Sequence, residues 1–219
     1  MSDGDPREVL RLRADTTVET DARGEVTLRS PHSSLSLGRP GPGLRAVIER
    51  LASTGGTARE LLELHRTAAT GEKPTEAIAL VQRLARAGRI ARCLEHRGKL
   101  LLVAHAPDAS RGQWAAALEP DAVLQLSRFA SIRREGERMV LESPLASARI
   151  ELHDRRVTAL LHDLARPTPA AVVIGRSKLP PLLVDAVLGV LVMGGLVSRV
   201  GAGGLLPEDA EPGPGMWDP

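Results

Sequence analysis

Six histidines, one cysteine and several carboxylate pairs are the side chains of this sequence that could do acid–base, metal or nucleophilic chemistry. Cys93 lies in an alternating apolar stretch and has no neighbouring base. The histidines show no i,i+4 pair and have no thiol pair nearby, so we predict no metal site and no catalytic constellation. They are His32, His65, His96, His105, His153 and His162.

Two other patterns resemble phosphate or acid–base sites but are better explained by loops. The segment 201–204 is glycine-rich, yet no predicted helix follows it whose N-terminus could hold a phosphate. The carboxylate pairs Asp15/Glu19 and Glu135/Glu137 lie in polar segments, where solvated charge is expected. We therefore do not expect the chain to be catalytic on its own.

The composition favours an aliphatic core and disfavours one class of nucleic-acid binder. Hydrophobic residues make up 42% of the 219 residues, but there are only one Phe, two Trp and no Tyr. Proteins that bind single strands stack bases on aromatic side chains, which this chain lacks. The net charge of +2 does not by itself mark a binder of polyanions.

Compartment signals favour a cytoplasmic protein. A single cysteine allows no disulfide within the chain and fits a reducing compartment. The acidic N-terminus, MSDGDPREV, is unlike a signal peptide. The most apolar run, residues 179–200, is interrupted by Pro180, Pro181 and Asp185, so its continuous part is too short to span a membrane. We predict a buried helix followed by a strand there.

The elements that would position functional side chains follow from periodicity and turn residues. Thr57 and Glu60 have the spacing of a capping box, and Gly88 is a natural helix C-cap. Expected strands are 9–13, 16–20, 26–29, 35–37, 89–95 and 99–104, the last two joined at Arg97-Gly98. Expected helices are 44–52, the segment from Thr57 to Gly71, and 74–87.

The second half of the chain repeats the first. Val140 to Leu152 (VLESPLASARIEL) and Val26 to Leu37 (VTLRSPHSSLSL) each read as a strand, Ser-Pro, small polar residues and a second strand. Residues 185–199 also align without gaps with 78–92. We predict an α+β protein of two tandem winged-helix-like modules, each with a small antiparallel sheet and about three helices. The modules are 1–106 and 123–204, with a connector at 107–122 and a proline-containing acidic tail at 205–219.

The two predicted modules differ in their helices. In the second, residues 168–179 favour only a short, poor helix, and the last helix, 182–193, is apolar almost all round apart from Asp185. Such a helix buries more than one face, so it should pack against the other module, another domain or a second subunit. The candidate interface residues are Ala148, Ile150, Leu152, Leu188 and Val192.

Two kinds of surface could bind a partner. The helix 74–87 is accompanied by Arg83, Arg86, Arg89 and Arg92 and could enter a DNA groove, although nearby carboxylates dilute its field and a solvated basic face is the alternative. The other is a sheet edge, whose unpaired N–H and C=O groups beside a helix can add an extended peptide as one more strand. The candidate edges are 35–37 and 148–152, unless loops cover them.

Residues 126–154 (LSRFASIRREGERMVLESPLASARIELHD) resemble the region upstream of the flavin domain in SagB-type azoline dehydrogenases. The stretch 26–52 and the tail 207–219 (PEDAEPGPGMWDP) are similar to the N-terminal part of these enzymes and to the lead-in to their flavin domain. The family oxidises thiazolines and oxazolines to azoles in ribosomally made peptides, with FMN bound in a nitroreductase-like domain. This chain stops at Trp217-Asp218-Pro219, so the resemblance implies no flavin-binding or catalytic residue here.

What the resemblance does imply is recognition of a precursor peptide. In winged-helix-like recognition elements of such pathways, a leader peptide docks as a strand between the third β-strand and the third helix. The corresponding segments here are 33–37 with 75–87 and 148–152 with 182–193, and the resemblance does not say which pair binds. The candidate peptide-binding residues are Leu35, Ser36, Leu37, Leu80, Arg83, Leu84 and Arg86.

We therefore expect a non-catalytic cytoplasmic protein of antibiotic biosynthesis that binds a precursor leader peptide, a flavin dehydrogenase or a cyclodehydratase during maturation of an azole-containing or thiopeptide-type peptide. We expect no cofactor in this chain and no membrane partner, and FMN would belong to a partner chain. The sequence does not decide between a monomer and a dimer. The alternatives are a split subunit of a flavin dehydrogenase that needs a nitroreductase-like partner, and a winged-helix regulator that binds DNA.

Overall fold

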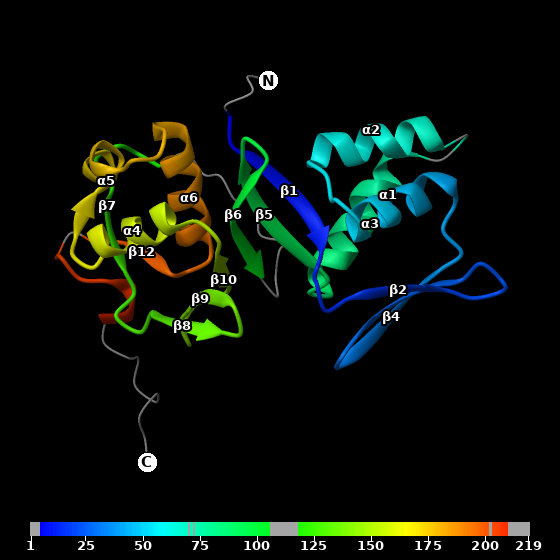
Figure 1. Cartoon of the computed structure of the whole chain (residues 1–219), viewed down its shortest axis with the longest axis horizontal. Helices are drawn as coiled ribbons and strands as arrows, with labels where there is room; N and C mark the ends of the chain where they lie inside the picture. The colour runs from blue at the N-terminus through cyan, green and yellow to red at the C-terminus, as the bar shows by residue number, and fades with distance from the viewer. Residues whose placement is uncertain (1–4, 70, 72, 106–117, 202, 210–219) are drawn as a thin grey trace, which may run out of the picture. The chain divides into compact units, whose positions relative to one another are not determined.

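A computed structural model describes residues 5–69, 71, 73–105, 118–201 and 203–209. This part of the chain is α+β, with six α-helices and several small antiparallel sheets (Figure 1). The chain divides into two compact units, which we call the first unit (7–112) and the second unit (113–219, with residues 1–6). The predicted connector at 107–122 lies largely outside the described residues.

The first unit has the element order that the sequence predicts. β2, β3 and β4 form one antiparallel sheet in that order, while β1 pairs with β5 and β5 with β6, both antiparallel. The elements are β1 (Arg7–Leu12), β2 (Thr17–Thr20), β3 (Val26–Ser30), β4 (Ser33–Gly38), α1 (Pro42–Ala52), α2 (Ala58–Ala68), α3 (Pro74–Arg86), β5 (Ile90–His96) and β6 (Lys99–His105).

Local signals set the boundaries of these elements. The Thr57 hydroxyl accepts a hydrogen bond from the Glu60 amide at 3.2 Å, and the Glu60 carboxylate accepts one from the Thr57 amide at 2.9 Å, so the predicted capping box at α2 is confirmed. Gly88 follows α3 with a φ of +64°, which a residue with a Cβ rarely adopts. The predicted Arg97-Gly98 turn between β5 and β6 is also confirmed.

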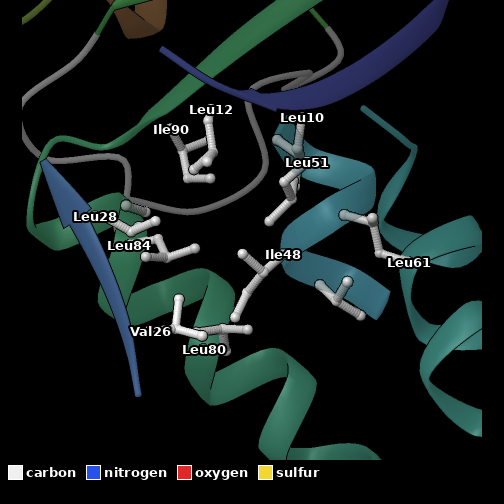
Figure 2. Packing of buried hydrophobic residues seen from close by; sticks show 12 residues of the cluster. Leu10, Leu12, Val26, Leu28, Ile48, Leu51, Leu61, Leu80, Leu84 and Ile90 are labelled. Atoms are coloured by element: carbon white, nitrogen blue, oxygen red, sulfur yellow. The ribbon is translucent and has the colours of Figure 1, made fainter. Parts of the chain in front are cut away.

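The core of the first unit is aliphatic, as the composition predicts. Figure 2 shows side chains from β1, β3, β5, α1 and α3 directed toward one another. Leu28 of β3 and Leu84 of α3 are fully buried within it, and Ile48 of α1 is 1% exposed. Burial of one such side chain stabilises the fold by about 1.5–3 kcal/mol. This packing fixes α3 against the sheet that carries β4.

The second unit contains the same kinds of element. Antiparallel pairing joins β8 to β9 and β9 to β10, so the predicted hairpin around Ser143-Pro144 is confirmed. The middle helix is short and the last one largely buried, as expected. The elements are β7 (Val123–Leu126), β8 (Ser131–Glu135), β9 (Arg138–Glu142), β10 (Arg149–Leu152), α4 (Arg155–Asp163), β11 (Thr168–Pro169), α5 (Ala170–Arg176), α6 (Pro181–Met193), β12 (Val197–Arg199) and the 3₁₀ helix η1 (Pro207–Asp209).

Pairing registers show that the two units are copies of one fold. β7 pairs with β12 in the register in which β1 pairs with β5, and β8 pairs with β9 in the register in which β2 pairs with β3. In both units the first strand also pairs with a residue just before the second helix. The matching pairs are Leu12–Ile90 with Leu126–Val197, Val18–Leu28 with Ile132–Leu141, and Leu10–Gly56 with Leu124–Thr168. The repeat in the sequence is therefore a repeat of structure.

None of the described helices is both long enough and apolar enough to cross a membrane. The most apolar of them, α6, has 13 residues. Its buried residues include Leu183, Val187 and Gly189, which lie on more than one side of the helix, so the predicted burial of more than one face is confirmed.

Candidate peptide-binding edge

β4 is the outer strand of the sheet β2-β3-β4. A two-residue turn joins it to β3, and Ser30 lies opposite Ser33 at the closing pair. Such a closing pair exchanges both of its backbone hydrogen bonds, and the bonded pairs then alternate along the ladder. The backbone N–H and C=O groups of Ser34 and Ser36 therefore point away from β3. They are the groups that a further strand would use.

Two arginines reach β4, Arg83 from the last turn of α3 and Arg89 from the position just before β5. The Arg83 guanidinium donates to the backbone carbonyl of Ser36 at 2.7 Å. The Arg89 guanidinium donates to the carbonyl and the hydroxyl of Ser33, at 2.9 and 2.6 Å. Arg83 is exposed, whereas Arg89 is only 5% exposed. The helix and the strand are thus held together by long cationic side chains.

Basic residues predominate in and after β4 and in α3 beyond its first turn, where Glu76 lies. The segments 33–39 and 77–89 contain four arginines and no carboxylate; the four are Arg39, Arg83, Arg86 and Arg89. Within the described residues, none of these arginines forms an ion pair with a carboxylate. We call β4 together with these four side chains the cationic edge. Its positive charge is not neutralised from within the described part of the chain.

The predicted peptide-binding residues fall into two groups. Ser36, Arg83 and Arg86 are exposed, and Leu35 and Leu37 are half-buried along β4. Leu80 and Leu84 belong instead to the hydrophobic core, where they are 7% and 0% exposed. These two leucines therefore lie beneath the edge and hold α3 in place. The sequence predicts Arg89 only as part of a basic face, because its burial depends on contacts that the sequence does not display.

The corresponding edge of the second unit is built differently. The repeat places Val190, Met193 and Leu196 where the first unit has Arg83, Arg86 and Arg89, and Ala148 where it has Ser33. The backbone amides of Ser147 and Ala148 donate directly to the Gly194 carbonyl, at 2.9 and 3.1 Å. Strand and helix are thus joined by backbone and apolar contacts instead of arginines.

The predicted interface residues of the second unit are mostly covered by the chain itself. Ala148, Ile150, Leu152 and Leu188 are 0–7% exposed, and Val192 is half-buried. Ile150 lies opposite Leu141 in the β9–β10 ladder, so its side chain shares a face with a fully buried leucine. Most of these side chains are therefore buried in the described structure, and their assignment to an interface stays a prediction.

Other chemistry has little support among the described residues. No group of three or more His, Cys, Asp and Glu side chains is placed there to hold a metal ion, and Cys93 is buried. The basic face proposed for DNA is also reduced, because Arg89 is buried and Arg92 forms an ion pair with Glu8 at 2.6 Å.

Fold and edge together define a duplicated α+β protein in which one copy has a sheet edge flanked by arginines. Residues 124–217 match the family model of the cyanobactin oxidase ThcOx. This range is less than half of the chain, and it lies in the second unit. The match agrees with the resemblance to oxidases that modify ribosomally made peptides, but it does not single out the SagB-type dehydrogenases. No curated protein matches the chain.

Proposed function

We propose that the first unit binds the leader segment of a precursor peptide during maturation of a ribosomally made, azole-containing peptide. The observation that carries this proposal is the open edge of β4, where the outward-facing groups of Ser34 and Ser36 lie beside α3. A leader peptide would add to this edge as a fourth strand. Backbone hydrogen bonds would supply affinity, and the half-buried Leu35 and Leu37 would contact its side chains.

Binding of this kind serves a modifying enzyme by proximity. A peptide held by its leader keeps its core segment at a high effective concentration near a partner active site. In this arrangement the chain itself needs no catalytic residue. The modifying enzyme would be a flavin dehydrogenase or a cyclodehydratase.

The test is fluorescence polarisation with the labelled leader peptide of a precursor gene that neighbours the gene for this chain. The informative variant is Ser36→Pro, which removes an outward N–H and leaves the ladder to β3 intact. Ser36→Ala is the matched control, because it removes the hydroxyl and keeps the N–H. We expect Ser36→Pro to abolish binding and Ser36→Ala to retain it. Equal binding by both variants, or no binding by the parent chain, contradicts the proposal.

A second candidate function rests on the match over residues 124–217. The second unit would then be the part that associates with a separate, FMN-carrying oxidase chain. The experiment is co-expression of the chain with a nitroreductase-like protein encoded beside it. The chain purified alone should be colourless, and the co-purified complex should carry flavin absorbance. Absence of a complex from every such neighbouring chain would rule this function out.

A further inference from the structure

Arg89 is a buried cation whose positive charge has no counter-ion in the described structure. Its side chain is 5% exposed, it hydrogen-bonds Ser33, and its Nε has no hydrogen-bond partner among the described residues. A buried charge without an opposite charge is costly to the fold. Such a group is therefore kept for a reason other than stability, or it pairs with an anion that the chain itself does not supply.

The second unit provides an internal control for a purely structural role. There the repeat places a fully buried Leu196 at the position of Arg89 and Ala148 at that of Ser33. The strand that follows this position nevertheless pairs in the same register in both units, β5 with β1 and β12 with β7. The fold thus does not require an arginine at this point, and the cation of the first unit is available for recognition.

Arg83 occupies the acceptor that an added strand would need. Its guanidinium donates to the Ser36 carbonyl, which points away from β3. A docking peptide would bring its own N–H to that carbonyl and would compete with the guanidinium of Arg83 for it. A carboxylate on the incoming peptide would give the released guanidinium a stronger, charge-assisted partner. A neutral peptide would offer it only a solvent-exposed position.

We propose, on the basis of the proposed function, that the cationic edge selects an acidic extended peptide and that Arg83 exchanges the Ser36 carbonyl for a carboxylate of that peptide. Arg89 fixes the start of β4 and contributes positive potential where the peptide lies. The two arginines contact β4 three residues apart, which corresponds to about 10 Å along a strand. A peptide strand of four or more residues with acidic side chains spans both.

The experiment is selection of a phage-displayed random dodecapeptide library on the immobilised full chain, followed by fluorescence polarisation of the enriched peptides. We expect enrichment of Asp and Glu over the starting library. Replacing the acids of an enriched peptide by Asn and Gln should weaken binding about tenfold or more. Arg83→Gln should reduce that acid preference to about threefold or less.

Two further variants separate recognition from folding. Arg89→Leu combined with Ser33→Ala reproduces the apolar pair of the second unit, so it should fold and yet lose affinity for the acidic peptide. Arg59→Gln removes the same charge from an exposed position on α2 and should leave binding unchanged. Amide chemical shifts report whether an enriched peptide perturbs β4.

The outcomes distinguish the two proposals. Enriched peptides that perturb β4 without acidic enrichment, or an acid preference that Arg83→Gln leaves intact, overturn the selectivity inference while the proposed function stands. Binding that leaves β4 unperturbed, or no enrichment at all, overturns both. Acidic peptides that perturb β4 and lose their advantage on Arg83→Gln support both.

Discussion

The two units share a fold but differ at the place where the last helix lies beside the edge strand. In the first, strand and helix are bridged by Arg83 and Arg89, whose guanidinium groups donate to β4. In the second, the amides of Ser147 and Ala148 donate to the Gly194 carbonyl at the end of α6. The registers of the other strand pairs match, so the difference is confined to the last helix and the hairpin. The hairpin connection is residues 31–32 in the first unit and the longer segment 143–148 in the second.

The difference indicates which parts of the fold are structural and which are free to vary. Apolar side chains and small residues are sufficient to hold the last helix beside the sheet, as the second unit shows. The arginines of the first unit are therefore additions to a fold that can form without them. Unneutralised charge kept at an open edge points to binding, whereas apolar closure at the same place points to packing.

The largest effect should come from moving the cation into the second unit. Leu196→Arg places a charge at a fully buried position, where Ala148 offers no hydroxyl to accept a hydrogen bond. We expect the free energy of unfolding to fall by about 3–5 kcal/mol, as for an unpaired buried charge. The reverse change, Arg89→Leu with Ser33→Ala, should leave it unchanged or raise it by about 1 kcal/mol. Urea denaturation measures both, and equal losses would remove the contrast.

Matching core truncations test whether the units are energetically independent. Leu28 and Leu141 occupy equivalent places and are both fully buried. Each change to alanine should cost about 2–5 kcal/mol. Hydrogen exchange should show faster opening of amides in the mutated unit only. Equal acceleration in both units for either variant would mean that they unfold as one.

Close packing at Gly194 should make the second unit sensitive to one methyl group. A Cβ there would lie 3.1 Å from the Ala148 Cβ and 3.1 Å from the Val190 carbonyl oxygen. Gly194→Ala should therefore destabilise the protein by about 1–3 kcal/mol. The first unit has Ala87 at this position, and Ala87→Gly should cost no more than about 1 kcal/mol. A tolerated Gly194→Ala would show that the backbone contact of strand and helix is not tight.

The second helices differ in their capping. Thr57 caps α2 through its hydroxyl, whereas α5 begins after Pro169 with no side-chain cap. Thr57→Ala should lower the free energy of unfolding by about 1 kcal/mol. Thr57→Ser keeps the hydroxyl and is the control, which should retain most of the stability. A loss of similar size for both would assign the effect to packing of the methyl group.

The smallest expected effect is on how the stability of the protein depends on pH. The Thr57 amide lowers the pKa of Glu60 below its ordinary 4.5, and Arg156 lowers the pKa of Asp154 below 3.8. A carboxylate with a lowered folded pKa stabilises the protein above its unfolded pKa, and this contribution disappears as the pH falls through the folded pKa. The urea midpoint of the first unit should therefore change less between pH 6 and pH 3 in Glu60→Gln than in the parent chain. Asp154→Asn should have the same effect on the urea midpoint of the second unit. An unchanged pH dependence would contradict this assignment.

Sequence reasoning predicted the elements well where their causes are local. The capping box at Thr57 and the Ser-Pro hairpins depend on residues close together in the chain, and the repeat made each unit a check on the other. The edge itself was predictable only in outline. Helical periodicity identifies an apolar face but does not separate a core leucine such as Leu84 from one that lines a surface. The Arg83–Ser36 contact joins residues 47 apart, and no local pattern encodes it.

The shared register also bears on how the chain avoids misfolding. β5 could pair with β7 in place of β1, because Leu124 and Leu126 present the same side chains as Leu10 and Leu12. The ion pairs Arg92–Glu8 and Arg11–Glu95 distinguish the correct partner. Paired with β7, Arg92 and Glu95 would face Ala122 and Gln125 and lose both counter-charges. These part-buried ion pairs therefore favour pairing of β5 with β1 over pairing with β7.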